Sequence, residues 1–250
     1  MTDYLVFDCE TNGFPDGYIK GDSNRPDPIS MSPCYISSCR LASIAWKIGG
    51  VEKETLIRPN GWSMTEEATN INGLTDQRLV STGVDFIQMW GEFKDACRDV
   101  VYLVGYGVEF DDKVIASELY IREMTSDLHW WNEKRKIDVG VRGLIQQTLK
   151  WVSTKYWPMR LGTLYTKLTK KVKVMTNAHN AMYDVQITDE VWSILRKQNK
   201  YSLRSLYIPM LSSLPEIEDI MIEIDDDEEI EATNEDMERA FPGWIALNVV

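Results

Sequence analysis

The sequence opens with a short apolar run, Tyr4-Leu-Val-Phe7, which continues directly into Asp8-Cys-Glu-Thr11. The run predicts a buried β-strand, and two acidic residues follow at its end, two positions apart. Because side chains at positions i and i+2 leave the same face of a strand, both carboxylates can reach one metal ion. Pairs of this kind also occur at solvated strand ends that bind nothing, so other residues must decide between the two interpretations.

A second acidic motif lies in Gly105-Tyr-Gly-Val-Glu-Phe-Asp-Asp-Lys-Val-Ile115, after the buried apolar run Val100–Val104. This pattern predicts a strand followed by a helix. Asp111 would lie near the helix N-terminus, where the helix dipole favours a carboxylate. Helix capping is the alternative role for such aspartates, and it is the role that we expect for Asp112.

The third motif is His179-Asn-Ala-Met-Tyr-Asp184, which places an imidazole five residues before another carboxylate. On one ideal helix these two side chains would point about 140° apart. A shared site therefore requires His179 to lie in the loop just before the helix that carries Asp184. The chain has only 2 histidines, so this combination rarely arises by chance.

Hydrophobic spacing predicts the remaining elements. Phe86, Met89, Trp90 and Phe93 recur at three- and four-residue intervals, which is typical of an amphipathic helix. The expected strands are Tyr4–Phe7, Leu41–Trp46, Thr55–Ile57 and Val100–Val104, and the expected helices are Val84–Cys97, Lys113–Arg122, Leu144–Lys150 and Met182–Arg196. Thr11–Cys39 is rich in Gly, Pro, Asp and Ser and is predicted to be a long loop. Strands come first and helices dominate later, which favours an α/β fold with a mixed sheet covered by helices.

Composition limits the class of protein. A chain of 250 residues with 44% hydrophobic residues can bury a large core. It has no apolar run of about 18 residues and no basic-then-apolar start, so we expect a cytoplasmic protein without a membrane span. The four cysteines are few for this length, and reduced thiols are expected. A zinc site at Cys34 and Cys39 is the alternative, and free loop thiols are the better interpretation.

The net charge of −12 is distributed unevenly. Residues 1–128 carry 11 basic residues (Lys and Arg) and 21 acidic residues (Asp and Glu). Residues 129–204, the basic segment, carry 15 basic and 5 acidic residues. Residues 216–238 carry no basic residue and 13 acidic residues. Tryptophans and a tyrosine alternate with the basic residues between Trp130 and Trp157. Such a segment can bind single-stranded nucleic acid through phosphate contacts and base stacking. A solvated helix face with core tryptophans explains each of these residues equally well.

Together the three motifs resemble the DnaQ-like exonucleases with a catalytic histidine, the DEDDh class, which includes the proofreading exonucleases of replicative DNA polymerases. All five family positions are matched, by Asp8, Glu10, Asp111, His179 and Asp184. The resemblance extends over about residues 3–198. It includes Asn72-Gly-Leu-Thr75, similar to a family H-G-I-T stretch, and Arg160–Leu168 before the third motif. The sister class has a tyrosine at the position of Asn180, so this residue excludes that class.

The resemblance implies a ribonuclease H-like fold with a central five-stranded mixed sheet. It also implies hydrolysis of the terminal phosphodiester at a 3′ end, with release of nucleoside 5′-monophosphates. The four carboxylates would hold two Mg²⁺ ions, which Mn²⁺ can replace. His179 would be the general base, and Thr11 and Phe14 are candidate substrate contacts. Single-stranded DNA is the favoured substrate, in proofreading or in DNA degradation and repair.

Two alternative functions remain open at this point. One is the trimming of RNA 3′ ends, as by ribonuclease T or oligoribonuclease, because these motifs do not read the 2′-hydroxyl. The other is a catalytically silent nucleic-acid-binding module, which would require a lost ligand, whereas all five positions are present. Tyr106-Gly107 stands where many members have His-Asn, and the loop Thr11–Cys39 is longer than usual. Both departures concern substrate positioning rather than metal ligands.

Two domains are expected, an exonuclease domain over residues 1–200 and an extension over 201–250. The extension contains the acidic run and ends in an apolar segment around Phe241 and Trp244. An acidic run is most often solvated, disordered chain. The sharper hypotheses for residues 216–250 are a tether to a polymerase or another replication partner, and an internal mimic of nucleic acid on the basic segment.

Overall fold

The computed structural model describes residues 3–14, 39–140, 160–170 and 180–198. Its centre is one sheet of five strands in the order β3-β2-β1-β4-β5. The strands are β1 (Tyr4–Thr11), β2 (Leu41–Ile48), β3 (Val51–Leu56), β4 (Tyr102–Gly105) and β5 (Arg135–Asp138). β1 pairs antiparallel with β2 and parallel with β4, so the sheet is mixed, as the sequence predicted. A mixed sheet of five strands covered by helices is the arrangement that the resemblance implied.

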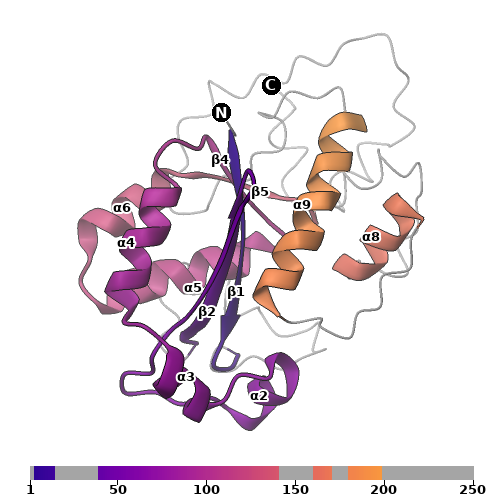
Figure 1. The fold of residues 1–250 in the computed structure, drawn as a ribbon. Helices are drawn as coiled ribbons and strands as arrows, with labels where there is room; N and C mark the ends of the chain where they lie inside the picture. Colours follow the sequence, from indigo (N-terminus) through magenta and orange to yellow (C-terminus); the bar gives the residue numbers. More distant parts are fainter. Residues whose placement is uncertain (1–2, 15–38, 141–159, 171–179, 199–250) are drawn as a thin grey trace, which may run out of the picture.

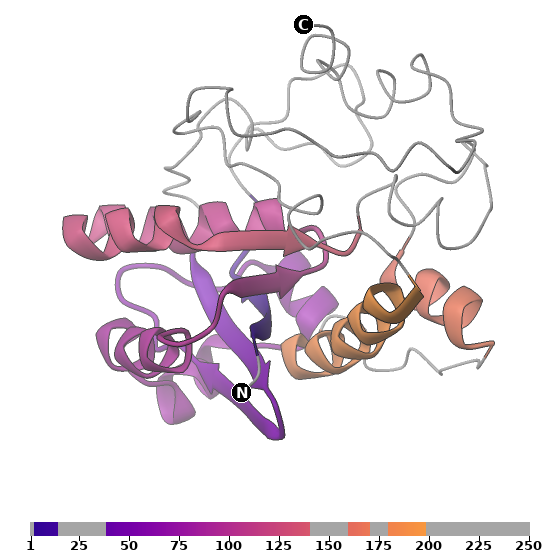
Figure 2. The same cartoon turned by 90° about the horizontal axis from the view of Figure 1, so that it is seen from above.

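Helices cover both faces of the sheet (Figures 1 and 2). One face carries α4 (Phe86–Ala96), α5 (Val108–Ile121) and α6 (Thr125–Glu133), and the other carries α8 (Leu161–Thr169) and α9 (Ala181–Gln198). The short helices α2 (Glu66–Asn72) and α3 (Asp76–Thr82) lie beyond the end of the sheet towards which β1 runs. Within the described residues, no helix is long and apolar enough to cross a membrane.

Alternation along β1 decides which face each side chain joins. Leu5, Phe7 and Cys9 are buried in the core beneath α4, α5 and α6. Val6 is buried in the second core, beneath α8 and α9. Because the side-chain period of a strand is two residues, Asp8 and Glu10 share the face of Val6. The hydrophobic residues of β1 thereby direct both carboxylates towards α9.

The predicted elements are confirmed where they fall on described residues. The helix expected over Lys113–Arg122 begins earlier, at Val108, and the strand expected over Thr55–Ile57 is Val51–Leu56. The helix expected over Leu144–Lys150 lies outside the described residues. The sequence did not reveal β5, α2, α3, α6 or α8. These elements are short, and β5 reads Arg-Lys-Ile-Asp, which has no apolar run for a hydrophobic pattern to detect.

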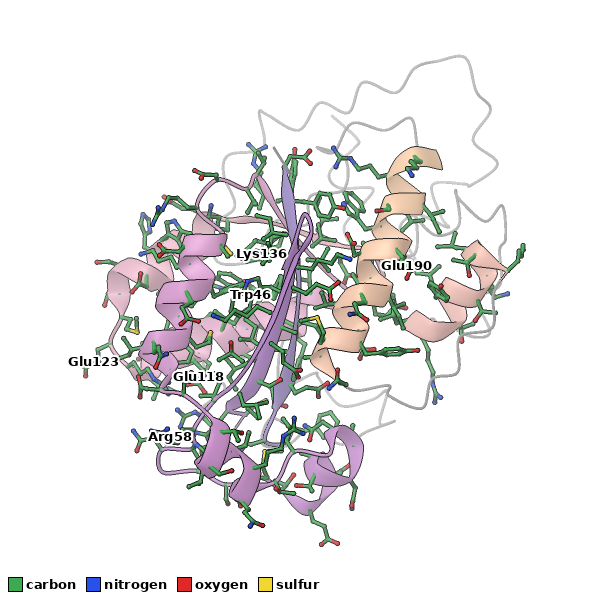
Figure 3. The ribbon with its side chains drawn as sticks, viewed as in Figure 1. Trp46, Arg58, Glu118, Glu123, Lys136 and Glu190 are labelled. Carbon is green, nitrogen blue, oxygen red and sulfur yellow. The ribbon has the colours of Figure 1, made fainter. Side chains whose placement is uncertain are left out.

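The role expected for Asp112, helix capping, is wrong. The N-cap position of α5 is Gly107, in the left-handed conformation with φ 69°. Asp112 lies in the next turn, fully buried, with a carboxylate oxygen 3.0 Å from Nζ of Lys136. The Lys136 ammonium also donates to the Trp131 carbonyl at 2.6 Å and lies 4.3 Å from the centre of the Trp131 ring. Figure 3 shows Lys136 on the α4–α6 side of the sheet, within the core rather than on a nucleic-acid surface.

The substitution Lys136→Met is expected to lower the free energy of unfolding by about 3–5 kcal/mol, because it leaves the buried Asp112 carboxylate without its cation. Urea denaturation measures this free energy directly. Arg135→Met, at the exposed neighbouring position, is the control and should change it by about 0.5 kcal/mol or less. Equal losses in the two variants would show that the buried pair does not stabilise the fold.

A second buried carboxylate ties α5 to the start of β2. Glu118 accepts hydrogen bonds from Nε of Arg40 at 2.8 Å and from the Leu41 backbone N–H at 2.9 Å. It also pairs with Arg122, the C-cap residue of α5. Figure 3 shows Glu118 on the same side of the sheet as Lys136. The two ion pairs fix α5 against the sheet at separate points.

The thiols of Cys9, Cys39 and Cys97 are free and buried. The reduced state expected from the sequence stays a prediction. Cys39 donates from Sγ to the Gly13 carbonyl at 3.1 Å, which joins the chain just before β2 to the turn after β1. Cys34 lies outside the described residues, so the choice between zinc and free thiols at that pair stays a prediction.

Candidate active site

Three carboxylates meet where β1 ends beside α9. Asp8, Glu10 and Asp184 each present one oxygen, and these three oxygens lie within 4.8 Å of one another. Asp8 and Glu10 come from the same face of β1, as the sequence predicted. Asp184 comes from the first turn of α9, which packs across that face. The group could hold a metal ion by its chemistry, because hard divalent cations prefer carboxylate oxygens.

The start of α9 explains why Asp184 reaches this group. The Tyr183 N–H donates to Oδ1 of Asn180 at 3.1 Å, so Asn180 caps the helix. Ala181 and Val185 are buried against the sheet, and Asp184 precedes Val185 on the edge of that apolar stripe. The helix therefore begins between His179 and Asp184, as the motif spacing required. His179 itself lies outside the described residues, and its place in the site stays a prediction.

Asp111 reaches the same end of the sheet from the opposite face. Its Oδ1 accepts the Cys9 backbone N–H at 3.2 Å, beyond the last β1–β4 pair, Val6 with Val104. The side chain of Asp111 is almost completely buried. Cys9 lies between Asp8 and Glu10 in the chain, so this hydrogen bond places Asp111 beside both, and the charge of Asp111 raises the pKa of Asp8. Asp111 thus adjoins the group of three carboxylates without belonging to the tight set defined by the 4.8 Å limit.

The raised pKa values of these carboxyls show that the ionised cluster is unfavourable without bound cations. Burial raises the pKa of Asp8 well above its usual value, and the nearby carboxylates raise it further. Burial and the charge of Asp184 raise the pKa of Glu10 to about 8, and a hydrogen bond from the Asn72 side chain opposes that rise. Burial also raises the pKa of Asp111. Protons or divalent cations must offset this crowded negative charge, so the donor set fits the metals that the sequence predicted.

Asp138 is a positioning residue that the sequence reading missed. It ends β5, and its Oδ1 accepts the backbone N–H groups of Gly107 at 2.9 Å and Gly140 at 2.6 Å. Gly107 is the N-cap of α5, so Asp138 fixes the turn that presents Asp111. In the sequence, Asp138 is only a lone aspartate after Lys-Ile. It becomes informative once β5 is known to run parallel to β4 and to end beside it.

The two candidate substrate contacts lie next to the carboxylates in sequence. Thr11 donates from Oγ1 to the Gly13 carbonyl at 2.9 Å, so its hydroxyl shapes the turn after β1. Phe14 has 37% of its surface exposed at the end of that turn. Of the aromatic residues in the basic segment, Trp131 is fully buried and Trp130 packs against the same core. Residues 141–159, which include Trp151, Tyr156 and Trp157, lie outside the described residues.

A family model described as RNase T, exonuclease, matches residues 5–191. The chain belongs to this exonuclease family. The match includes the three motifs and all four acidic positions, so the DnaQ-like resemblance is confirmed. A search of curated proteins found no match.

Solved structures share the fold of the exonuclease. Exonuclease I of E. coli in complex with a dT13 oligonucleotide has a TM-score of 0.58 at 19% identity, over 79% of this chain and 42% of that chain. Exonuclease I of Methylocaldum szegediense has a TM-score of 0.57 at 20% identity, over 78% of this chain and 40% of that chain. Exonuclease X in complex with 5′ overhanging duplex DNA has a TM-score of 0.50 at 16% identity, over 81% of this chain and 96% of that chain. The chain spans less than half the length of the Exonuclease I proteins, and at these identities the likeness concerns the fold alone.

Proposed function

We propose that this exonuclease removes nucleotides one at a time from the 3′ end of single-stranded or frayed DNA and releases nucleoside 5′-monophosphates. The observation that carries the proposal is the meeting of Asp8, Glu10 and Asp184 within 4.8 Å at the end of the sheet, in a chain of an exonuclease family. Asp111 adjoins them and completes the four acidic positions of the DEDDh pattern.

The four carboxylates would hold two divalent cations, Mg²⁺ or Mn²⁺. When bound, such ions offset negative charge on the attacked phosphate and on the leaving 3′ oxygen. The protein supplies placement: Asp8 and Glu10 extend from a central strand, and Asp184 and Asp111 extend from the first turns of two packed helices. Sites built on such rigid elements hold their geometry better than sites on loops.

His179 is proposed as the general base. An imidazole has an ordinary pKa of about 6.5, so one of its nitrogens can accept a proton from the attacking water near neutral pH. The capped start of α9 at Asn180 supports this role, because His179 directly precedes it in the chain while Asp184 lies in the first turn. Phe14 is proposed to stack on the terminal base from its exposed position after β1.

DNA is proposed over RNA because the solved structures with this fold include complexes with a dT13 oligonucleotide and with overhanging duplex DNA. Proofreading or DNA degradation and repair are the processes that need such an activity. The proposed tether to a polymerase or another replication partner, residues 216–250, lies outside the described residues. So does the boundary between the domains 1–200 and 201–250, and both stay predictions.

The test uses 5′-labelled single-stranded DNA and RNA of the same sequence, with the full chain, in Mg²⁺, in Mn²⁺ and in chelator. A ladder of products shortened from the 3′ end of DNA, absent in chelator, is the expected result. A ladder that forms preferentially on RNA would show that RNA is the substrate of the same 3′ to 5′ hydrolysis. Binding without shortening in either metal would favour the catalytically silent module and reject the proposal.

A further inference from the structure

Helix α2 is fastened at both ends to the turn that follows the β1 carboxylates. At its start, the Thr65 backbone N–H donates to the Asn12 carbonyl at 2.9 Å. Gly13 packs against the same threonine, since a Cβ added at Gly13 would lie only 3.0 Å from Thr65 Cγ2. At its end, Nδ2 of Asn72 donates to the Thr11 carbonyl at 3.1 Å. The helix therefore fixes the path of the chain immediately after Glu10.

The amide of Asn72 has one orientation that fits its neighbours. The Leu74 backbone N–H donates to Oδ1 at 3.0 Å, which directs Nδ2 towards β1. There Nδ2 donates to the carbonyl of Thr11, the residue next to Glu10, and the same amide lowers the pKa of the Glu10 carboxyl. An amide NH₂ carries two donor hydrogens, so both acceptors can be satisfied together. A flipped amide would bring Oδ1 against the Thr11 carbonyl and lose the hydrogen bonds to Thr11 and Leu74.

The helix does not need this side chain in order to end. Gly73 adopts the left-handed conformation with φ 71°, and its N–H donates to the Thr69 carbonyl at 2.8 Å. This backbone cap closes α2 by itself. The contact of Asn72 with Leu74 is a local turn, whereas its contacts with β1 join residues about sixty positions apart in the chain. The donors directed at β1 are thus available for a role in the site.

We propose that Asn72 is a positioning residue that sets the orientation of the Glu10 carboxylate for metal binding. One amide hydrogen holds this carboxylate, and the other holds the backbone carbonyl of the next residue, so the side chain of Glu10 and its strand are fixed by the same group. Partners that orient a metal ligand in this way commonly contribute tenfold or more to metal affinity. The inference rests on the proposed metal-dependent function and adds a residue to it.

The test measures Mn²⁺ binding to the full chain by titration calorimetry, without substrate. Asn72→Ala is expected to weaken Mn²⁺ binding about tenfold or more. Asn70→Ala is the matched control, because Asn70 lies in the same helix with an exposed side chain, and it should bind Mn²⁺ like the wild type. Asn72→Ala is also made in a Glu10→Gln background, where it should cause no further loss.

The outcomes separate this inference from the function on which it rests. Equal Mn²⁺ affinity in Asn72→Ala and the wild type would overturn the role of Asn72 and leave the metal centre standing. An equal loss with Glu10 and with Glu10→Gln would also overturn it, because Asn72 would then act through the fold and not through Glu10. Absence of Mn²⁺ binding by the wild type would overturn the metal centre itself, and the positioning role with it.

Discussion

Asp184→Asn is expected to reduce the rate of nucleotide release by about a thousandfold or more, and to make the metal-free protein more stable. The amide keeps the shape of the side chain but removes a charge from the group of three carboxylates. A loss of about 4 kcal/mol of transition-state stabilisation corresponds to such a rate change. The same substitution relieves repulsion of Glu10, whose pKa the charge of Asp184 helps to raise to about 8.

The sign of the stability change follows from that pKa. A carboxyl with a raised pKa in the folded state costs stability as pH increases from its ordinary value of about 4.3 towards 8. Thermal unfolding in chelator should therefore show a higher Tm for Asp184→Asn than for the wild type at pH 8–9, and a smaller difference at pH 5. Asp95→Asn, at an exposed carboxylate on α4, should retain wild-type activity. Full activity of Asp184→Asn would show that Asp184 is not part of the active site.

His179→Ala is expected to lower kcat by about a hundredfold to ten-thousandfold, the range that a general base contributes. Metal binding should be unchanged, because the imidazole is proposed to take a proton and not to hold an ion. The measurement pairs the kcat for single-stranded DNA with Mn²⁺ titration of the same protein. Loss of both properties together would assign His179 to the metal centre.

The other histidine of the chain provides the control for this variant. His129 lies on α6 with its side chain 78% exposed and is paired with Glu133. His129→Ala should leave kcat unchanged. A similar decrease in kcat for both variants would contradict a specific role of His179 in catalysis.

The parts of the site that the sequence predicted depend on local regularities. The alternation of Leu5, Phe7 and Cys9 with Asp8 and Glu10 follows from the period of a strand, so the shared face of the two carboxylates could be read directly. The helix start at Asn180 follows equally from the geometry of one helix. In both cases a hydrophobic pattern set the orientation of the acidic residues nearby.

The parts that the sequence did not predict depend on contacts between distant segments. Asp112 reads as a capping residue, and only the position of Lys136 on β5 makes it one half of a buried ion pair. Asp138 gains its role from the parallel pairing of β5 with β4. Asn72 lies in a recognisable stretch, but nothing in its local sequence indicates that its amide reaches Glu10 across the fold. Pairing between strands and helices distant in sequence leaves no periodic signal in the chain.

The most direct test of the central claim is the position of Mn²⁺ in a crystal of the full chain, located by its anomalous scattering. We expect Mn²⁺ in contact with carboxylate oxygens of Asp8, Glu10 and Asp184, with Asp111 adjoining. Mn²⁺ bound elsewhere, with these carboxylates protonated or paired with cationic side chains, would contradict it.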